Sequence, residues 1–210
     1  MHQKCNQMKI RVNDAGKRFN RDWIFRNLHL SFSKDETYAI TGHNGSGKST
    51  LLQCIAGSTY LSEGSISFEL NGTEIPTEKL FYYVSICAPY LEVIEEMTAI
   101  EFFNYHQQFK KLKPTIGIPA IIDQIGLSKH AHKQIRYFSS GMKQRIKLAQ
   151  AFFSDTPILL LDEPCTNLDQ QGIALYNTLL SEHGKERIVL ISSNDQTEYK
   201  TCTQVIQLGV

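Results

Sequence analysis

Residues 42–49 read GHNGSGKS, which matches the pattern G-x-x-x-x-G-K-[ST] of a phosphate-binding loop. The preceding residues Thr37–Thr41 are β-prone and partly apolar, so we expect them to form a buried strand. The following residues Ser49–Ala56 suit a helix, and Gly57 lies where such a helix would end. A strand, a glycine-rich loop and a helix in this order are the setting that the motif requires. The stretch therefore predicts an α/β protein that binds a phosphorylated ligand.

The residue types of this loop suit phosphate groups. Glycines let the backbone approach an anion closely, and successive N–H groups at the start of a helix attract it. We expect Lys48 to reach the β- and γ-phosphates of a nucleotide and the Ser49 hydroxyl to ligate Mg²⁺, which prefers hard oxygen ligands. An ordinary glycine-rich turn is the alternative, and the Lys48-Ser49 pair disfavours it. The candidate phosphate-binding residues are Gly42, Asn44, Gly45, Ser46, Gly47, Lys48, Ser49 and Thr50.

The overall charge disfavours a partner recognised through bulk electrostatics. The chain of 210 residues has 22 Lys and Arg against 21 Asp and Glu, for a net charge of +1. This balance argues against nucleic acid as a direct partner and against charge-driven membrane binding. The five cysteines are scattered and form no C-x-x-C pair, so the sequence suggests neither a zinc site nor a disulfide framework. Reduced thiols in a cytoplasmic protein are the favoured interpretation.

The sequence predicts no membrane-spanning segment. Met1–Arg11 is polar and lacks the apolar core of a signal peptide. No run of 18 apolar residues occurs in the chain, which disfavours a transmembrane helix.

The first part of the chain has the patterns of strands. Residues Gly64–Leu70 alternate apolar and polar side chains, and the Asn71-Gly72 pair that follows is a strong signal for a hairpin turn. The other expected strands are Met8–Asn13, Ile24–Phe32 and Leu80–Ile86. A hairpin is therefore expected around Asn71-Gly72.

The middle of the chain has the patterns of helices. Helices are expected at Thr98–Phe109, Ile118–Ile125 and Ser139–Phe153, with a break at Lys110–Pro114. In the third helix one apolar face is formed by Met142, Ile146, Ala149 and Phe153. The remaining expected elements are the strand Ile158–Leu161, the helix Gln170–Gly184 and the strands Ile188–Ser192 and Val205–Leu208. We expect one domain over 1–210, with a core of about 1–88 and 155–210 and a helical subdomain of about 89–154.

A buried strand that ends in two acids supplies the other half of a candidate site. Residues 158–164 read ILLLDEP, and charges at such a place are costly unless they are solvated, paired or bound to a metal. Asp162 suits a Mg²⁺ ligand, and Glu163 suits a general base that polarises a water for attack on the γ-phosphate.

The segment Tyr137–Arg145, which reads YFSSGMKQR, resembles the signature segment of the ABC ATPases, usually L-S-G-G-Q followed by a basic helix. Asp162-Glu163-Pro164 and Thr166–Asp169 are similar to the Walker B end and the D-loop of that family. The four motifs occur in the family's order, and the resemblance covers residues 10–210. It implies a P-loop NTPase core with a mixed or parallel sheet, an antiparallel β subdomain and a helical signature subdomain. It also implies ATP and Mg²⁺ as ligands.

The resemblance implies a site shared between two chains. In the family, the signature residues contact ATP held by the other subunit, in a C2 homodimer or a heterodimer. Here Ser139 and Gly141 of the signature are kept, whereas Phe138, Ser140 and Met142 replace the usual Leu, Gly and Gln. The residues implied to contact that ATP are Ser139, Ser140, Gly141 and Asp169. A plain helix N-cap is the alternative role for the serines.

The resemblance also implies an aromatic residue that stacks on the adenine. Phe19 is the candidate, with Trp23 as the alternative, although a lone Phe is more often a core residue. Two other residues of the family are missing. Ala88 or Pro89 stands where the family has a Gln near the metal, and Asn194 stands where it has a His that contacts the γ-phosphate. These changes predict a slow ATPase, unless a shifted Gln or an acid such as Glu92 refills the gap.

The family resemblance implies an ATPase subunit that powers a separate transmembrane permease at the cytoplasmic face of the membrane, with an exporter favoured. A coupling surface is implied near the missing Gln, where Tyr90, Leu91, Val93, Ile94 and Met97 cluster. Core packing of the helical lobe is the alternative role for that cluster. Two further functions stay open, namely a soluble ABC ATPase that does not transport and a binding-only subunit paired with a competent one.

Overall fold

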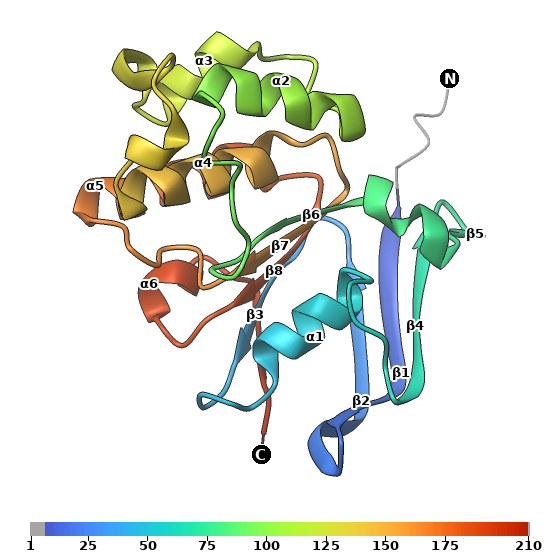
Figure 1. The fold of residues 1–210 in the computed structure, drawn as a ribbon. Helices are drawn as coiled ribbons and strands as arrows, with labels where there is room; N and C mark the ends of the chain where they lie inside the picture. Colours follow the sequence, from blue (N-terminus) through green and yellow to red (C-terminus); the bar gives the residue numbers. More distant parts are fainter. Residues whose placement is uncertain (1–6, 210) are drawn as a thin grey trace.

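The computed structural model describes residues 7–209. Cys5 and the start of the polar segment Met1–Arg11 lie outside the described residues. The described chain forms two sheets with helices around them (Figure 1). The first sheet is antiparallel, with the strand order β2-β1-β4-β5. Its strands are β1 (Met8–Phe19), β2 (Asp22–Ser33), β4 (Glu63–Leu70) and β5 (Thr73–Glu74).

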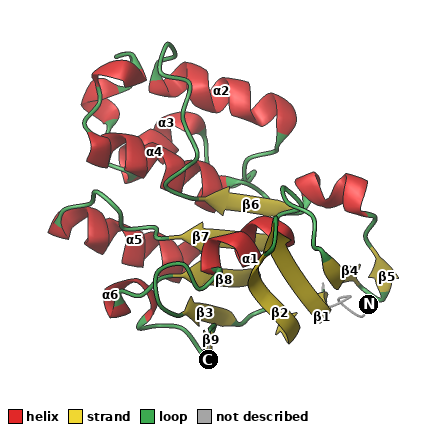
Figure 2. Ribbon diagram, turned by 60° about the horizontal axis from the view of Figure 1, so that its bottom comes forward, coloured by secondary structure: helices red, strands yellow, loops and turns green. Residues whose placement is uncertain are grey.

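The second sheet is parallel throughout and has the order β6-β7-β8-β3-β9. Figure 2 shows its strands side by side in this order. The central strands β7 and β8 are buried along their whole length, as expected for a parallel sheet covered on both faces. The strands are β3 (Thr37–Thr41), β6 (Val84–Cys87), β7 (Ile158–Asp162), β8 (Ile188–Ser192) and β9 (Gln204–Gln207).

The helices lie on the two faces of the parallel sheet. Figure 1 shows α2, α3 and α4 stacked on one side of it, and α1 with the antiparallel strands on the other. The α-helices are α1 (Lys48–Ile55), α2 (Ala99–Phe109), α3 (Ile118–Gln124), α4 (Ser140–Phe153), α5 (Gln170–His183) and α6 (Gln196–Tyr199). Three short 3-10 helices are η1 (Thr77–Tyr82), η2 (Ser128–His130) and η3 (Ile135–Tyr137).

Alternate side chains of the central strands enter two different hydrophobic cores. Leu159 and Leu161 of β7 pack with the helices α2, α3, α4 and α5. Ile158 and Leu160 of the same strand pack with α1 and the antiparallel sheet. Successive side chains of a strand point to opposite faces, so the apolar run 158–161 supplies both cores. The buried strand that the sequence predicts at this place is confirmed.

The register of the parallel sheet brings the ends of its strands to one edge. Cys87 of β6 pairs with Leu161 of β7, and Asp162 pairs with Ser192 of β8. Ser192 also pairs with Ile40 of β3. The loops that follow β3, β6, β7 and β8 therefore leave the sheet side by side, and these loops carry the sequence motifs.

The predicted strand Leu80–Ile86 is wrong at its start. The chain forms η1 until Tyr82 and enters β6 only at Val84. Pro76 begins this 3-10 helix, where its carbonyl accepts the N–H of Lys79. Phe81 is 53% exposed, so part of the apolar pattern that suggested a buried strand lies at the surface.

Two other local predictions are confirmed. Asn71 and Gly72 both have positive φ values, 54° and 80°, and close the hairpin between β4 and β5. In α4 the predicted apolar face is buried at Ile146, Ala149 and Phe153. β1 is longer than the predicted Met8–Asn13, because a bulge at Asp14 (φ 48°) interrupts the alternation without ending the strand.

No helix among residues 7–209 combines the length and the apolar character that crossing a membrane requires.

Candidate functional site

The glycine-rich loop lies between β3 and α1, against the antiparallel hairpin. Gly42 and Gly47 have φ values of 147° and 95°, which L side chains rarely adopt. A Cβ at Gly47 would also lie 2.6 Å from Cγ2 of Ile24 on β2, and one at Gly42 would lie 2.5 Å from the carbonyl oxygen of Leu208. The glycines are therefore required both by the turn and by the close packing of the loop.

Lys48 begins α1 and folds back over the loop. Its side chain is buried, and its Nζ donates to the carbonyl oxygens of Gly42 (2.6 Å) and His43 (3.2 Å). No acidic residue lies in the first turn of α1 and no side chain caps it, so the positive end of the helix is not neutralised. The buried Ser46 hydroxyl has no hydrogen-bond partner among the described residues. This end of α1 therefore combines a cation with free donors, as an anion site needs.

Asp162 offers an unused oxygen at the end of β7. Its side chain is 1% exposed, and its Oδ1 has no hydrogen-bond partner among the described residues. A buried acceptor without a partner costs about 1–3 kcal/mol. α1, which carries Ser49 in its first turn, packs against β7. A carboxylate and a hydroxyl at this edge of the sheet are hard oxygen donors, which suit Mg²⁺.

Glu163 leaves the end of β7 in an unusual backbone conformation. Its φ is 42°, a region that costs a residue with a side chain roughly 1–2 kcal/mol. The N–H of Glu163 donates to the carbonyl of Ser192 (2.9 Å), and its carbonyl accepts the N–H of Thr166 (3.1 Å). The side chain is exposed. The turn thus presents a carboxylate to solvent directly beside the buried Asp162.

Asn194 lies against the beginning of the glycine-rich loop. Its Oδ1 accepts the N–H of Gly42 (3.2 Å), and its Nδ2 donates to Oδ1 of Asn44 (3.3 Å). The structure therefore brings together the loop and the residue that follows β8, although 152 positions separate Gly42 from Asn194. The amide can donate a hydrogen bond to an anion but carries no charge.

The signature segment forms a second cluster at the start of α4. Ser139 caps this helix, since its Oγ accepts the N–H of Met142 (3.2 Å). Asp169 caps α5 through the N–H of Gly172 (2.8 Å) and pairs with Arg145 of α4 (3.4 Å). A hollow of about 330 Å³ lies between the two helix starts, lined by residues that include Ser139, Ser140, Gly141, Asn167 and Asp169.

The two clusters are separate within one chain. Over residues 7–209, no hydrogen bond joins the loop 42–50 to the segment 139–141, and the hollow at the start of α4 is not lined by the loop. The N-cap role that the sequence left as an alternative for Ser139 is present. This role does not exclude ligand binding, because the helix start remains exposed at Ser139 and Ser140.

Of the two aromatic candidates for adenine, Phe19 has the more accessible ring. It ends β1 and is 49% exposed, with Nζ of Lys17 at 4.7 Å from the ring centre. Trp23 lies close to two guanidinium groups, those of Arg18 (5.6 Å) and Arg26 (4.4 Å).

The segment after β6, where the sequence predicts that a Gln is missing, begins with the apolar residues Ala88 and Pro89. Ala88 is fully buried after β6. Tyr90 follows on this segment and lines the same pocket as Gln53 of α1. Burial raises the pKa of Tyr90, and the charge of Asp162 raises it further. Glu92 instead lines a groove under α2.

The sequence did not indicate two buried residues of this region. Gln144 of α4 is buried, and its Nε2 donates to the carbonyl of Pro164 (2.7 Å) in the turn after Glu163. Glu198 of α6 is also buried, and its side chain accepts the N–H of Cys165 in the same turn. Both contacts join segments far apart in the chain, so no local pattern could have indicated them.

The loop between a parallel strand and a helix, and the acid-ended strand beside it, define a P-loop nucleotide-binding protein. The ABC transporter family model matches residues 25–166, and the chain belongs to this family as an ATP-binding protein. It is 29% identical over 191 residues to an uncharacterised ABC transporter ATP-binding protein, YybJ, of Bacillus subtilis (strain 168), covering 90% of this chain and 87% of YybJ.

The chain is also similar to a second relative, and its fold is similar to a solved structure. The chain is 31% identical over 163 residues to the cytochrome c biogenesis ATP-binding export protein CcmA of Rhodopseudomonas palustris (strain BisB5), covering 76% of this chain and 78% of CcmA. Its fold matches the dimeric post-hydrolysis structure of the ATP-binding cassette MJ0796 bound to ADP and Pi. That match has a TM-score of 0.79 at 21% identity and covers 95% of this chain and 94% of the other.

Proposed function

We propose that this chain hydrolyses ATP at the loop 42–50 and thereby powers a separate transmembrane ABC permease, with export as the favoured direction. The observation that carries the proposal is the combination of the buried Lys48, the uncapped start of α1 and the unpartnered oxygen of Asp162 at one edge of the sheet. The similarity to CcmA, which is named an export protein, supports the direction. A place at the cytoplasmic face of the membrane, held there by the permease, belongs to the same proposal.

The residues of the site have separate proposed roles in binding and hydrolysis. The backbone N–H groups of the loop and Lys48 bind the phosphates, and Phe19 stacks on the adenine. Ser49 and Asp162 hold Mg²⁺, which when bound draws charge from the phosphate oxygens. Glu163 accepts a proton from the attacking water. Asn194 donates a hydrogen bond to the γ-phosphate in exchange for its present bond to Asn44.

The second cluster is proposed to serve another copy of the chain. Ser139, Ser140, Gly141 and Asp169 are separate from the loop within one chain, yet they surround an exposed helix start of the kind that binds anions. A C2 dimer would place this helix start over the nucleotide of its partner. The helical subdomain of about 89–154, which carries α4, is the unit that we propose for this role.

The function is tested with the purified full-length chain, by measuring equilibrium binding of ATP and the release of phosphate with Mg²⁺ and with EDTA. We expect binding and release that both depend on Mg²⁺. Tight binding without release would instead support the binding-only subunit, which the missing Gln and His favour. A chain that neither binds ATP nor releases phosphate would contradict the proposal.

Replacing Asn194 with histidine is expected to raise the turnover number for ATP. A histidine supplies a donor that can also carry charge, and a single donor to a developing negative charge is commonly worth about 10²–10³-fold in rate. We therefore expect a gain of at least about tenfold in steady-state phosphate release. Gln196→His, an exposed position two residues further on, is the matched control. Equal rates for wild type and Asn194→His would show that Asn194 does not limit turnover.

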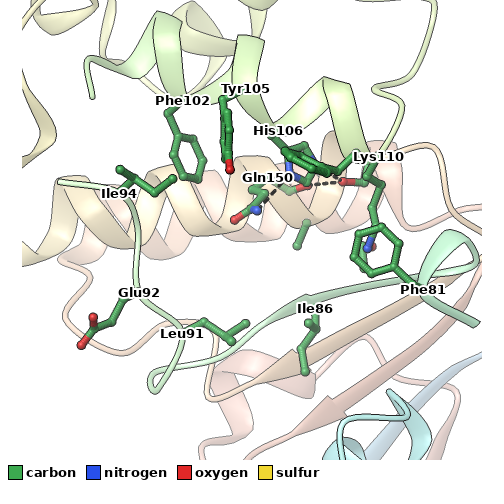
Figure 3. Close-up of a pocket in the computed structure, with 14 residues that line it drawn as sticks. Phe81, Ile86, Leu91, Glu92, Ile94, Phe102, Tyr105, His106, Lys110 and Gln150 are labelled. Atoms are coloured by element: carbon green, nitrogen blue, oxygen red, sulfur yellow. Dashed lines mark hydrogen bonds between the residues drawn. The ribbon is translucent and has the colours of Figure 1, made fainter. Parts of the chain in front are cut away.

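The permease is proposed to dock in a groove between α2 and β6 (Figure 3). The groove has a volume of about 510 Å³ and is lined mainly by apolar side chains that include Leu91, Ile94, Phe102, Tyr105 and Phe109. Of the apolar residues that the sequence placed here, Val93 is buried and Met97 packs against the core, whereas Leu91 and Ile94 are 36% and 37% exposed. Part of the predicted cluster is thus core, and part remains open to a partner.

Lys110 and Glu92 are the charged residues that line the groove, and they suggest the chemistry of its occupant. Lys110 lies at one end, where its Nζ donates to the carbonyl of Val84 (2.6 Å) and lies 4.1 Å from the centre of the Phe81 ring. No carboxylate among the described residues forms an ion pair with it. Burial lowers the pKa of Lys110 to about 8 and that of the neighbouring His106 to about 4. An amphipathic helix with an acidic residue at the Lys110 end suits this groove.

Replacing Lys110 with glutamate is expected to reduce association of the chain with its permease by about tenfold or more, because two acids would then meet. The measurement is co-sedimentation with membrane vesicles from the source organism. Association of the wild type should also weaken as the pH rises through about 8, because Lys110 then loses its charge. Lys111→Glu, an exposed neighbour, is the control. Equal losses in both variants would argue against this groove as the docking site.

A further inference from the structure

Glu198 connects two loops of the candidate site. It lies in α6 and is 5% exposed. Its Oε1 accepts the backbone N–H of Cys165 (2.7 Å), two residues after Glu163. Its own backbone carbonyl accepts the hydroxyl of Tyr176 on α5 (2.7 Å). The segment that precedes α6 carries Asn194, so one side chain joins the turn after β7 to the segment after β8.

The surroundings of Glu198 are unfavourable for a charge. Burial raises the pKa of its carboxyl group, and the negative charges of Asp195 and Glu163 raise it further. The Ser193 side chain and the Cys165 N–H act in the opposite direction. The thiols of Cys165 and Cys87 and the phenol of Tyr176 also lie within range of its charge. Within residues 7–209, no Lys, Arg or His forms an ion pair with it.

Ionisation of this buried acid, which has no cation paired with it among the described residues, lowers the stability of the fold. The pKa of Glu198 in the folded chain is above its unfolded value, so folding favours the protonated form. Stability is therefore lost as the pH rises and the group ionises, and the loss is complete above the folded-state pKa. An acid buried at this cost is a candidate for a role other than stability.

We propose that Glu198 is a positioning residue that holds the turn carrying Glu163 in register with the segment carrying Asn194. This inference rests on the proposed hydrolysis by Glu163. The geometry explains why a side chain is needed. Glu163 has a strained backbone, whose N–H donates to Ser192 and whose carbonyl accepts from Thr166. Glu198 accepts the next backbone N–H of the same turn, that of Cys165.

The first test is the kinetics of Glu198→Gln in the full-length chain. Glutamine keeps an acceptor for Cys165 but has no charge. We expect kcat for Mg-ATP to fall about 10–100-fold, the effect usually seen when a residue that orients a metal ligand is replaced. The KM should stay unchanged, because Glu198 does not touch the loop 42–50. The Tm at pH 8 should not fall, since the cost of ionisation is removed. Glu78→Gln, an exposed glutamate in η1, is the control.

The second test detects the contact between Glu198 and Cys165 without measuring hydrolysis. Burial and then the charge of Glu198 raise the pKa of the Cys165 thiol. Glu198→Gln should therefore speed alkylation of Cys165 by iodoacetamide at pH 8, measured on its peptide by mass spectrometry, whereas Glu78→Gln should not. Glu198→Asp, which keeps the charge but shortens the reach, should lower kcat as well.

Three results would overturn the inference: a wild-type kcat in Glu198→Gln, a loss of kcat matched by a loss of Tm, or an unchanged rate of Cys165 alkylation. A wild-type chain that binds ATP but releases no phosphate would contradict the proposed function instead. The alkylation rate would still decide whether Glu198 acts on this turn.

Discussion

Glu163→Gln is expected to lower the rate of phosphate release by about 10²–10⁴-fold and to leave the binding of ATP intact. General-base catalysis is usually worth this much, and glutamine has the shape of glutamate but cannot take up the proton at neutral pH. Glutamine can adopt the φ of 42° at the same cost as glutamate, so the turn is preserved. The measurement is single-turnover and steady-state phosphate release, together with gel filtration in Mg-ATP, in which the unreacted nucleotide should accumulate in a stable dimer.

Glu92→Gln is the matched control for this experiment. Glu92 lies on the groove under α2, and it is the acid that the sequence offered as a substitute for the missing Gln. We expect its replacement to leave turnover near the wild-type rate. A large loss of turnover in Glu92→Gln together with a small loss in Glu163→Gln would contradict the assignment of Glu163 as the general base. It would indicate that Glu92 has this role instead.

Lys48→Ala is expected to weaken the binding of Mg-ATP by about 10–150-fold. A hydrogen bond from a charged donor contributes about 1.5–3 kcal/mol, and each 1.4 kcal/mol is a factor of ten in Kd. Lys48 is already buried against the loop, where its ammonium group donates to the carbonyls of Gly42 and His43. The charge therefore lies at the turn of the loop. The measurement is titration calorimetry with a non-hydrolysable ATP analogue and Mg²⁺.

Lys79→Ala is the control, because Lys79 is an exposed lysine on η1. Its removal tests whether a change of one positive charge is enough to alter the affinity. Similar affinities for Lys48→Ala and wild type would show that the loop binds its anion through backbone groups alone. A Tm measurement for Lys48→Ala is needed as well, since the two carbonyls lose their donor.

The loop, the acid-ended strand and the parallel sheet could be predicted because their signals are local. Residues 42–49 and 158–163 each carry their own pattern, and a parallel sheet brings the ends of such strands to one edge. The meeting of Asn194 with Gly42 follows from the same topology. The sequence therefore predicted the segments that the sheet brings together, and their role as a nucleotide site stays a prediction.

The contacts that brace the site could not be predicted. Glu198 and Gln144 act through backbone groups of Cys165 and Pro164, and any residue type at those two positions would offer a similar group. The 3-10 helix η1 was missed for a different reason. Its apolar residues Phe81 and Tyr82 suggested a strand by composition, yet their side chains are exposed and pack edge to face on each other.

The buried amide of Gln144 has a mechanical consequence for the whole molecule. It ties α4 to the carbonyl of Pro164 (2.7 Å) and lies 3.7 Å from the sulfur of Cys87 at the end of β6. If α4 tilts, this hydrogen bond must either break or move the turn of Glu163 together with the helix. We therefore expect the start of α4 and Glu163 to move together rather than independently.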